Sequence, residues 1–362
     1  MRTLHHQELV DILVGATILG TGGGGSLEVG VQKVEHALNL GKEFNLVTID
    51  ELSPDDLIGT PYSCGAISPL TDEEIKKYER LPNYEMEYHI MSITNMEEYL
   101  KKPLKSVVST ELGGGNTAAA FYAGAMAGKA ILDADPAGRS VPGLQHSTYY
   151  LKGVPIYPMS LCNKFGESLI VRHVFDDERA EDLVRALAVV SQNTMAVCDH
   201  VNTAAVLKDA LILGAITYAE RVGKAFRMAK EQGGDYAQAV VDEVGGKFVA
   251  EGTVIKNDWY TEAGFTYGTM EIKSGEDLYR IWYQNENIIM WKNGEYFATV
   301  PDLICVFNNE EKMPQLNPNA QTGSSASIIV LPAPAEWTTV RGLEVFGPKS
   351  FGHDVEYVPF CK

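Results

Sequence analysis

Apolar residues in the first forty positions recur with the period of an α-helix. The spacing from Leu9 to Leu19 predicts one helix over residues 7–19, and a second is predicted over residues 27–40. The two are joined by "GTGGGGS". A glycine-rich turn that leads into a helix presents backbone N–H groups to an anion, so this turn is a candidate binding loop; the alternative is a flexible turn between helices.

Short buried strands alternate with helices between residues 44 and 135. "KSVVST" predicts a strand that ends at Glu111, "NTAAAFYAGAMAG" predicts the helix behind it, and "KAILDADP" predicts the next strand. This order is typical of a parallel sheet, whose ligands lie beyond the carboxyl ends of its strands. Glu111, Asp133 and Asp135 all fall at such ends.

The pattern changes twice in the second half of the chain. Helices are predicted over residues 177–190 and 203–232, and from residue 245 onward short alternating runs separated by turns indicate an antiparallel sheet or barrel. The predicted fold class is therefore an α/β N-terminal domain with a mostly parallel sheet, followed by a β-rich, barrel-like C-terminal domain with some helices. The expected boundaries are 1–165 for the first domain and 166–362 for the second, with its β part at about 245–358.

The formal net charge of -18 disfavours a nucleic-acid or anionic-membrane partner, because such partners require clustered Lys and Arg. A small-molecule substrate is expected instead, and a homo-oligomer is compatible with the composition. The N-terminal segment carries Glu8 and Asp11 where a signal peptide would be positive, so a cytoplasmic location is expected. The five cysteines show no CxxC pair, which favours reduced thiols.

The stretch "DADPAGRSVPGLQHST" brings together two carboxylates, an arginine and a histidine. Strand alternation would place Asp133 and Asp135 on one side, about 7 Å apart. Two carboxylates so close require a cation, which Arg139, His146 or a bound ion would supply. Asp133, Asp135 and His146 are accordingly a candidate ligand set for a divalent metal such as zinc. The alternative is an acidic surface turn.

Further polar groups stand out against apolar surroundings. "ELGGGN" combines Glu111, three bare backbone amides and Asn116, although Asn116 is also suited to cap the next helix. "YQNENI" and "PDLI" place polar groups within predicted strands, where they would form either the second domain's wall of a cleft or ordinary turns. "CDH", at 198–200, is interpreted as a loop, because adjacent residues rarely face one site.

Five long segments together resemble one bacterial and fungal family, once known only as a domain of unknown function and now named after S-methyl thiohydantoin desulfurase. They are "ATILGTGGGGSLEVG", "TELGGGNTAAAFYAGAMAGKAILDADPAGRSVPGLQHST", "GKFVAEGTV", "YQNENIIMWKNGEYFATVPDLICVF" and "EVFGPKSFGHDVEYVP". The resemblance spans nearly the whole chain and implies an α/β domain followed by a barrel-like β domain. Members often accompany hydantoinase and oxoprolinase homologues, which implies a place in hydantoin metabolism. The family pattern has methionine at His146 and tyrosine at His353.

The activity that the resemblance implies is a hydrolysis: water attacks the ring carbon bearing an S-methyl group, methanethiol leaves and a hydantoin remains. Asp133 or Asp135 would be the base or a metal ligand, His146 the acid or a ligand, and Glu111 a partner of ring N–H groups. The expected substrate-binding residues, which include those suited to an anionic tail, are Thr21, Gly22, Gly23, Gly24, Gly25, Asn116, Arg139 and Gln145.

Two other functions remain open at this point. In an ATP-dependent enzyme or accessory subunit, the glycine loops would hold phosphates and Asp133 or Asp135 would hold Mg2+. In a non-enzymatic binding protein, the same residues would bind a small molecule without turnover. The leading hypothesis is a hydrolase of a small cyclic amide or thiohydantoin-like ring.

Overall fold

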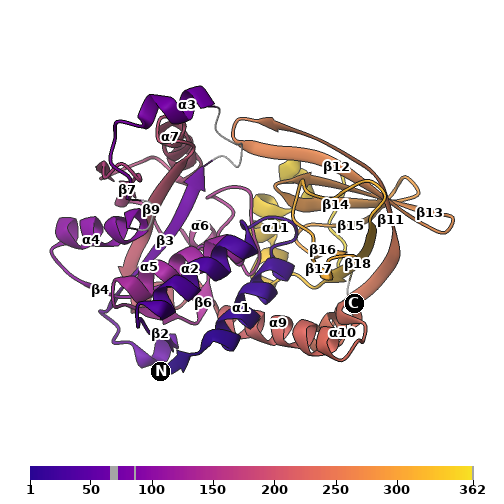
Figure 1. The fold of residues 1–362 in the computed structure, drawn as a ribbon, viewed down its shortest axis with the longest axis horizontal. Helices are drawn as coiled ribbons and strands as arrows, with labels where there is room; N and C mark the ends of the chain where they lie inside the picture. Colours follow the sequence, from indigo (N-terminus) through magenta and orange to yellow (C-terminus); the bar gives the residue numbers. More distant parts are fainter. Residues whose placement is uncertain (66–71, 85–86, 361–362) are drawn as a thin grey trace.

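The computed structural model describes residues 1–65, 72–84 and 87–360. It has an α/β domain and a β-rich domain, as predicted (Figure 1). The helices predicted on either side of "GTGGGGS" are confirmed as α1 (His6–Leu19) and α2 (Leu27–Asn39). The small-residue helix after "ELGGG" is confirmed as α5 (Gly114–Met126).

The first domain is built on a sheet to which the described residues contribute eight strands. In spatial order they are β1 (Arg2–Leu4), β2 (Phe44–Val47), β5 (Ala130–Leu132), β4 (Leu104–Val107), β3 (Leu57–Gly65), β9 (Thr194–Thr203), β7 (Met159–Cys162) and β8 (Ser168–Val171). The four strands from β2 to β3 are parallel neighbours, whereas the other pairs are antiparallel. The predicted parallel arrangement thus holds only at the centre, because β9 returns beside β3 in the opposite direction.

Helices cover both faces of this sheet. α1, α2 and α5 pack together on one side, and their apolar residues form a core with β4 and β5. On the other side, α7 (Asp177–Val189) packs against β3 and β9. The remaining helices of this half are α3 (Asp72–Tyr78), α4 (Tyr88–Leu100), α6 (Thr148–Lys152) and α8 (Ala204–Leu207), with a 3-10 turn η1 (Ile49–Glu51).

The single helix predicted over residues 203–232 is wrong. After α8 the chain forms β10 (Ile212–Leu213), which pairs with β6 (Ala134–Asp135), and only then begins α9 (Ala215–Glu231). Gly214 adopts a φ of +78°, which ends the extended segment and starts the helix. Helical spacing alone did not reveal this interruption, because the apolar positions on either side of it continue the same spacing.

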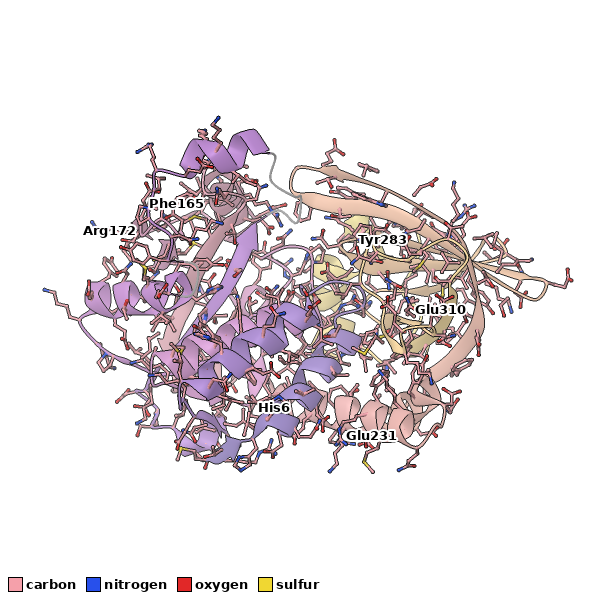
Figure 2. All side chains as sticks on the ribbon, in the orientation of Figure 1. His6, Phe165, Arg172, Glu231, Tyr283 and Glu310 are labelled. Carbon is pink, nitrogen blue, oxygen red and sulfur yellow. The ribbon has the colours of Figure 1, made fainter. Side chains whose placement is uncertain are left out.

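The second domain is an antiparallel sheet, again of eight strands among the described residues. In spatial order they are β15 (Glu295–Thr299), β14 (Glu286–Lys292), β13 (Asp277–Gln284), β12 (Phe265–Ser274), β11 (Lys247–Glu262), β18 (Ser325–Leu331), β16 (Leu303–Asn308) and β17 (Met313–Pro314). Figure 2 places Tyr283, which is fully buried, within these strands. The predicted β-rich domain is confirmed, but its sheet is not a closed barrel: β15 and β17 lie at opposite ends of the strand order and do not pair with each other.

Helices cover the part of the second sheet that contains β16 and β18. β16 and β18 are buried on both faces, and on one of them Leu303, Phe307 and Ile329 join the core of α1 and α9. α10 (Tyr236–Val244) packs on α9 and the strands, while α11 (Val340–Phe346) and the turns η2 (Ala335–Thr338) and η3 (Pro348–Phe351) complete the domain. One continuous apolar core therefore joins the two domains. None of the described helices has both the length and the apolarity of a membrane span.

α1 and α9 cross in backbone contact at the seam between the domains (Figure 1). A Cβ on Gly223 would lie 1.8 Å from the carbonyl oxygen of Asp11, and one on Gly15 would lie 1.8 Å from that of Ala219. The Asp11 carboxylate also pairs with Arg227 at 2.7 Å. Only glycine permits this close approach.

We predict that Gly223→Ala lowers the free energy of unfolding by about 1–3 kcal/mol, because the added methyl group forces the two helices apart. Chemical denaturation measures the effect. Gly234→Ala is the matched control, since its Cβ would meet one atom, at the ordinary distance of 3.6 Å. Equal stability of the two variants would contradict the close crossing.

Candidate functional site

A cavity of about 500 Å³ lies at the carboxyl ends of β3 and β4, where ligands of parallel sheets bind. Both domains contribute to its wall. The first domain supplies Gly22 to Ser26, Tyr62 to Gly65, Thr110, Glu111, Asn116, Val141 to Leu144, His146, Ser147, Glu181, Arg185 and Gln192 to Thr194. The second supplies Gly264, Thr266, Asn285, Glu286, Leu316, Asn317 and Asn319.

The two glycine loops meet through bare backbone at the edge of this cavity. Gly24 has a φ of +79°, and a Cβ there would lie 2.4 Å from the Cα of Gly113. The carbonyl of Gly24 accepts the N–H groups of Gly115 and Asn116, both at 3.0 Å, and so caps α5. In the part of the chain that the structure describes, the N–H groups of Gly22, Gly24 and Gly25 donate to no protein acceptor. They remain available to a ligand.

Two glutamates from different domains face this loop. Glu111 accepts from Asn116 Nδ2 at 2.6 Å through Oε1 and from the Val141 N–H at 2.8 Å through Oε2. Glu286, at the start of β14, accepts from the Ser140 hydroxyl at 2.8 Å through Oε1, while its buried Oε2 has no partner among the described residues. The Ser140 hydroxyl also contacts the Glu111 carboxylate. A Cβ on Gly23 would lie 1.8 Å from Glu286 Oε1, so glycine is required where the domains meet.

The glutamate pair shares its charge unequally. Burial raises the pKa of both carboxyls, and the neighbouring Glu111 charge helps to raise that of Glu286 to about 8. Both oxygens of Glu111 accept N–H bonds, which favour the ionised form, whereas Glu286 Oε2 accepts none. These contacts favour the ionised form at Glu111 and the protonated form at Glu286.

His146 lines the same cavity and is neutral. Burial, with the nearby Arg139 charge, lowers its pKa to about 3. Its Nδ1 accepts the Gly143 N–H at 3.1 Å, so the proton of the neutral ring is on Nε2. The ring packs against both Phe346 and Phe351, which also contact each other.

Arg139 lies outside the cavity lining, although we expected it to bind a substrate anion. It is completely buried and donates to five oxygens. These are the Thr21 hydroxyl and the carbonyls of Ser140, Asn287, Pro301 and Asp302. Burial lowers its pKa to about 10, so it stays protonated at neutral pH. Its positive charge compensates the carboxylate charge of the glutamate pair from outside the cavity. Thr21 likewise supports Arg139 and is absent from the lining, as is Gln145.

The two aspartates do not join this cavity. Strand β5 ends at Leu132, and the Asp133 carboxylate instead accepts the N–H and hydroxyl of Thr217, at 2.9 and 2.5 Å, in the first turn of α9. Asp135 belongs to the β6–β10 pair and accepts the N–H groups of Ala137 and Gly138. His146 accepts the Gly143 N–H, so each of the three predicted metal ligands binds a different part of the protein. No group of three His, Cys, Asp or Glu suited to a metal occurs among the described residues.

Several lining residues were missed or left open by sequence reasoning. Glu286 and Asn285 belong to "YQNENI", one of the polar segments noted as a candidate cleft wall. Nothing in the sequence around Glu181, Arg185 or Asn317 distinguishes them from surface residues. Cys64 also lines the cavity, and burial raises its pKa to about 12, so it is a thiol rather than a nucleophile. The described cysteines are all free, and Cys361 lies outside the described residues.

The "CDH" segment is part of β9 rather than a loop. His200 has a φ of +43°, which turns its ring toward the preceding side chain, so that Nδ1 lies 2.9 Å from Asp199 Oδ1. The other Asp199 oxygen accepts the Tyr62 hydroxyl at 2.7 Å. His353 packs against Trp282 and Trp291 on the second domain. Both histidines therefore have structural partners.

We predict that Asp135→Asn makes stability less dependent on pH. Burial raises the Asp135 pKa from 3.8 to about 8, and Oδ2 has no partner. The stability that the protonated Asp135 contributes is fully present below the pKa of this carboxyl in the unfolded chain. It is lost as the pH rises to about 8, the pKa in the folded protein. Denaturation at about pH 5 and about pH 8 should show that the variant gains about 1–3 kcal/mol relative to the parent at the higher pH. Asp209→Asn, at an exposed position, is the control; an unchanged difference at both pH values would contradict a neutral Asp135.

Comparisons with known proteins also divide the chain into two parts, although the C-terminal family model includes α7 and β9, which pack in the first sheet. Family models described as "S-Me-THD-like, N-terminal domain" and "S-Me-THD-like, C-terminal domain" match residues 7–173 and 175–360. A crystal structure of a structural-genomics protein from Chromobacterium violaceum has a similar fold, with 22% identity, a TM-score of 0.77, and coverage of 99% of this chain and 100% of that one. No curated protein matches. The chain belongs to the S-Me-THD-like family, named for S-methyl thiohydantoin.

Proposed function

We propose that the protein hydrolyses a small cyclic amide or thiohydantoin-like ring, with Glu111 as general base and Glu286 as general acid. The observation that carries the proposal is the unequal hydrogen bonding of two buried carboxyls on one cavity. Two titratable groups whose surroundings favour opposite protonation states are suited to acid–base catalysis. Family membership supports a thiohydantoin ring as the substrate.

The cavity wall suits a polar ring. Carboxamides line it from both domains, at Asn116, Gln192, Asn193, Asn285, Asn317 and Asn319. Such groups recognise the alternating donors and acceptors of a cyclic amide. The free N–H groups of Gly22, Gly24 and Gly25 would stabilise negative charge on an oxygen or on the ring.

The proposed reaction proceeds in two steps on an S-methyl thiohydantoin. Glu111 accepts a proton from water as the water oxygen bonds to the ring carbon, and the C=N electrons move to nitrogen, which takes the Glu286 proton. The carbon–sulfur bond then breaks. Sulfur leaves with the proton held by Glu111, and the hydroxyl proton returns to Glu286. The products are methanethiol and a hydantoin, and both glutamates regain their starting states.

We predict that Glu111→Gln and Glu286→Gln each lower kcat by about 10²–10⁴-fold, because each removes one proton-transfer group and keeps the side-chain shape. Methanethiol release from S-methyl thiohydantoins measures the effect, and ring-opened products should be sought from plain hydantoins. Glu295→Gln, an exposed glutamate on the second domain, should leave the rate unchanged. Folded parent protein with no turnover on any ring of this class would overturn the proposal.

The pH profile of kcat/KM provides a separate prediction. Activity should fall as the pH rises through about 8, where Glu286 loses its proton. It should also fall on the acid side as Glu111 gains a proton, at a pH above the ordinary glutamate value because burial raises its pKa. In Glu286→Gln the alkaline limb should disappear from the residual activity. A profile that keeps this limb would assign it to another group.

A further inference from the structure

A second, smaller hollow adjoins the cavity at Arg185. It has a volume of about 270 Å³ and is bounded by Ala186, Ala188 and Val189 of α7 and by the turn at Ala263 and Gly264. This turn joins β11 to β12, and the hairpin reaches toward α7 (Figure 1). Gly65, Arg185, Asn193 and Gly264 line both hollows, so the smaller one, here called the outer hollow, continues the cavity.

The walls of the two hollows differ in chemistry. The main cavity presents carboxyls and carboxamides. Arg185 and Asn193 line both hollows. The other described side chains of the outer hollow are alanine methyl groups and the isopropyl group of Val189, with Ala188 buried at 2% exposure and Val189 at the rim with 68% exposure. Burying apolar carbon against these alanine and valine side chains gains free energy, and these side chains themselves offer no partner to a charge.

Arg185 separates the hollows and is already engaged. It pairs with Glu181, at 2.6 Å from Nη2 and 2.8 Å from Nε, which neutralises its charge. Its Nη1 donates to the carbonyls of Gly264 at 3.0 Å and Gly65 at 3.3 Å, and its guanidinium lies 4.2 Å from the centre of the Phe265 ring. An anionic group would have to displace Glu181. Arg185 is therefore a fixed divider and not a receptor for a carboxylate tail.

We infer that the outer hollow is a subsite for an uncharged, apolar substituent of the ring substrate. The inference rests on the proposed function for the placement of the ring itself, beside Glu111 and Glu286. A substituent on the ring carbon next to the carbonyl would pass Arg185 and rest against Ala188 and Val189. The preferred substrates are accordingly rings with aliphatic or aromatic substituents rather than bare rings.

Calorimetric titration of the full chain with hydantoin and its 5-methyl, 5-isobutyl and 5-benzyl derivatives tests the subsite. Each buried methylene should lower Kd about threefold to fourfold, so the isobutyl ring should bind at least about tenfold more tightly than the bare ring. Val189→Asp places a charge at the rim and should remove most of this gain, while binding of the bare ring stays within about twofold. Val190→Asp is the matched control, because Val190 is exposed, adjacent and outside both hollows.

The outcomes separate this inference from the proposed function. Affinity that ignores the substituent, or an equal loss in Val189→Asp and Val190→Asp, would overturn the subsite. Binding that increases with substituent size and responds only to Val189→Asp would support it, even if no ring is hydrolysed. Such binding without hydrolysis of any ring would overturn the proposed function alone. If no ring binds at all, both the subsite and the proposed function are overturned.

Discussion

Contact between bare backbones at Gly24 and Gly113 fixes the geometry on which the candidate site depends. Because no side chain separates the two loops, the carbonyl of Gly24 reaches the first N–H groups of α5 and holds Asn116 beside Glu111. The adjacent Gly23 leaves the space into which Glu286 extends from the other domain. The tetraglycine loop, the loop before α5 and the start of β14 therefore meet at a point where an added Cβ would push them apart.

The roles of the two glutamates follow from their surroundings rather than from residue type. Glu111 lies where N–H groups converge on both of its oxygens, and Glu286 lies where one oxygen has no partner. Arg139 stands behind both and is held by oxygens from each domain. Its charge balances the pair without entering the cavity, which leaves room there for an uncharged ring.

Close packing at the domain seam joins the two parts of this arrangement. Apolar residues of α1, α9, β16 and β18 form one core, and α1 crosses α9 without intervening side chains. The hairpin of the second domain is tied to α7 through Arg185. Two connections, one apolar and one polar, therefore join the domains that line the cavity.

Local patterns in the sequence were sufficient to predict the helices on either side of the tetraglycine, the antiparallel C-terminal strands, and the placement of Glu111 and Asn116 beyond the carboxyl end of a strand. Helical and strand periods depend on residues a few positions apart, so a sequence displays them directly. The prediction that Asp133 and Asp135 face one site was wrong because strand β5 ends at Leu132. The Asp133 carboxylate instead binds the first turn of α9, about eighty residues later in the chain. Glu286 reaches the cavity from the second domain, and Glu181 and Arg185 reach it from α7 of the first. Only the tertiary structure decides these placements, because no local spacing records which distant surfaces will meet.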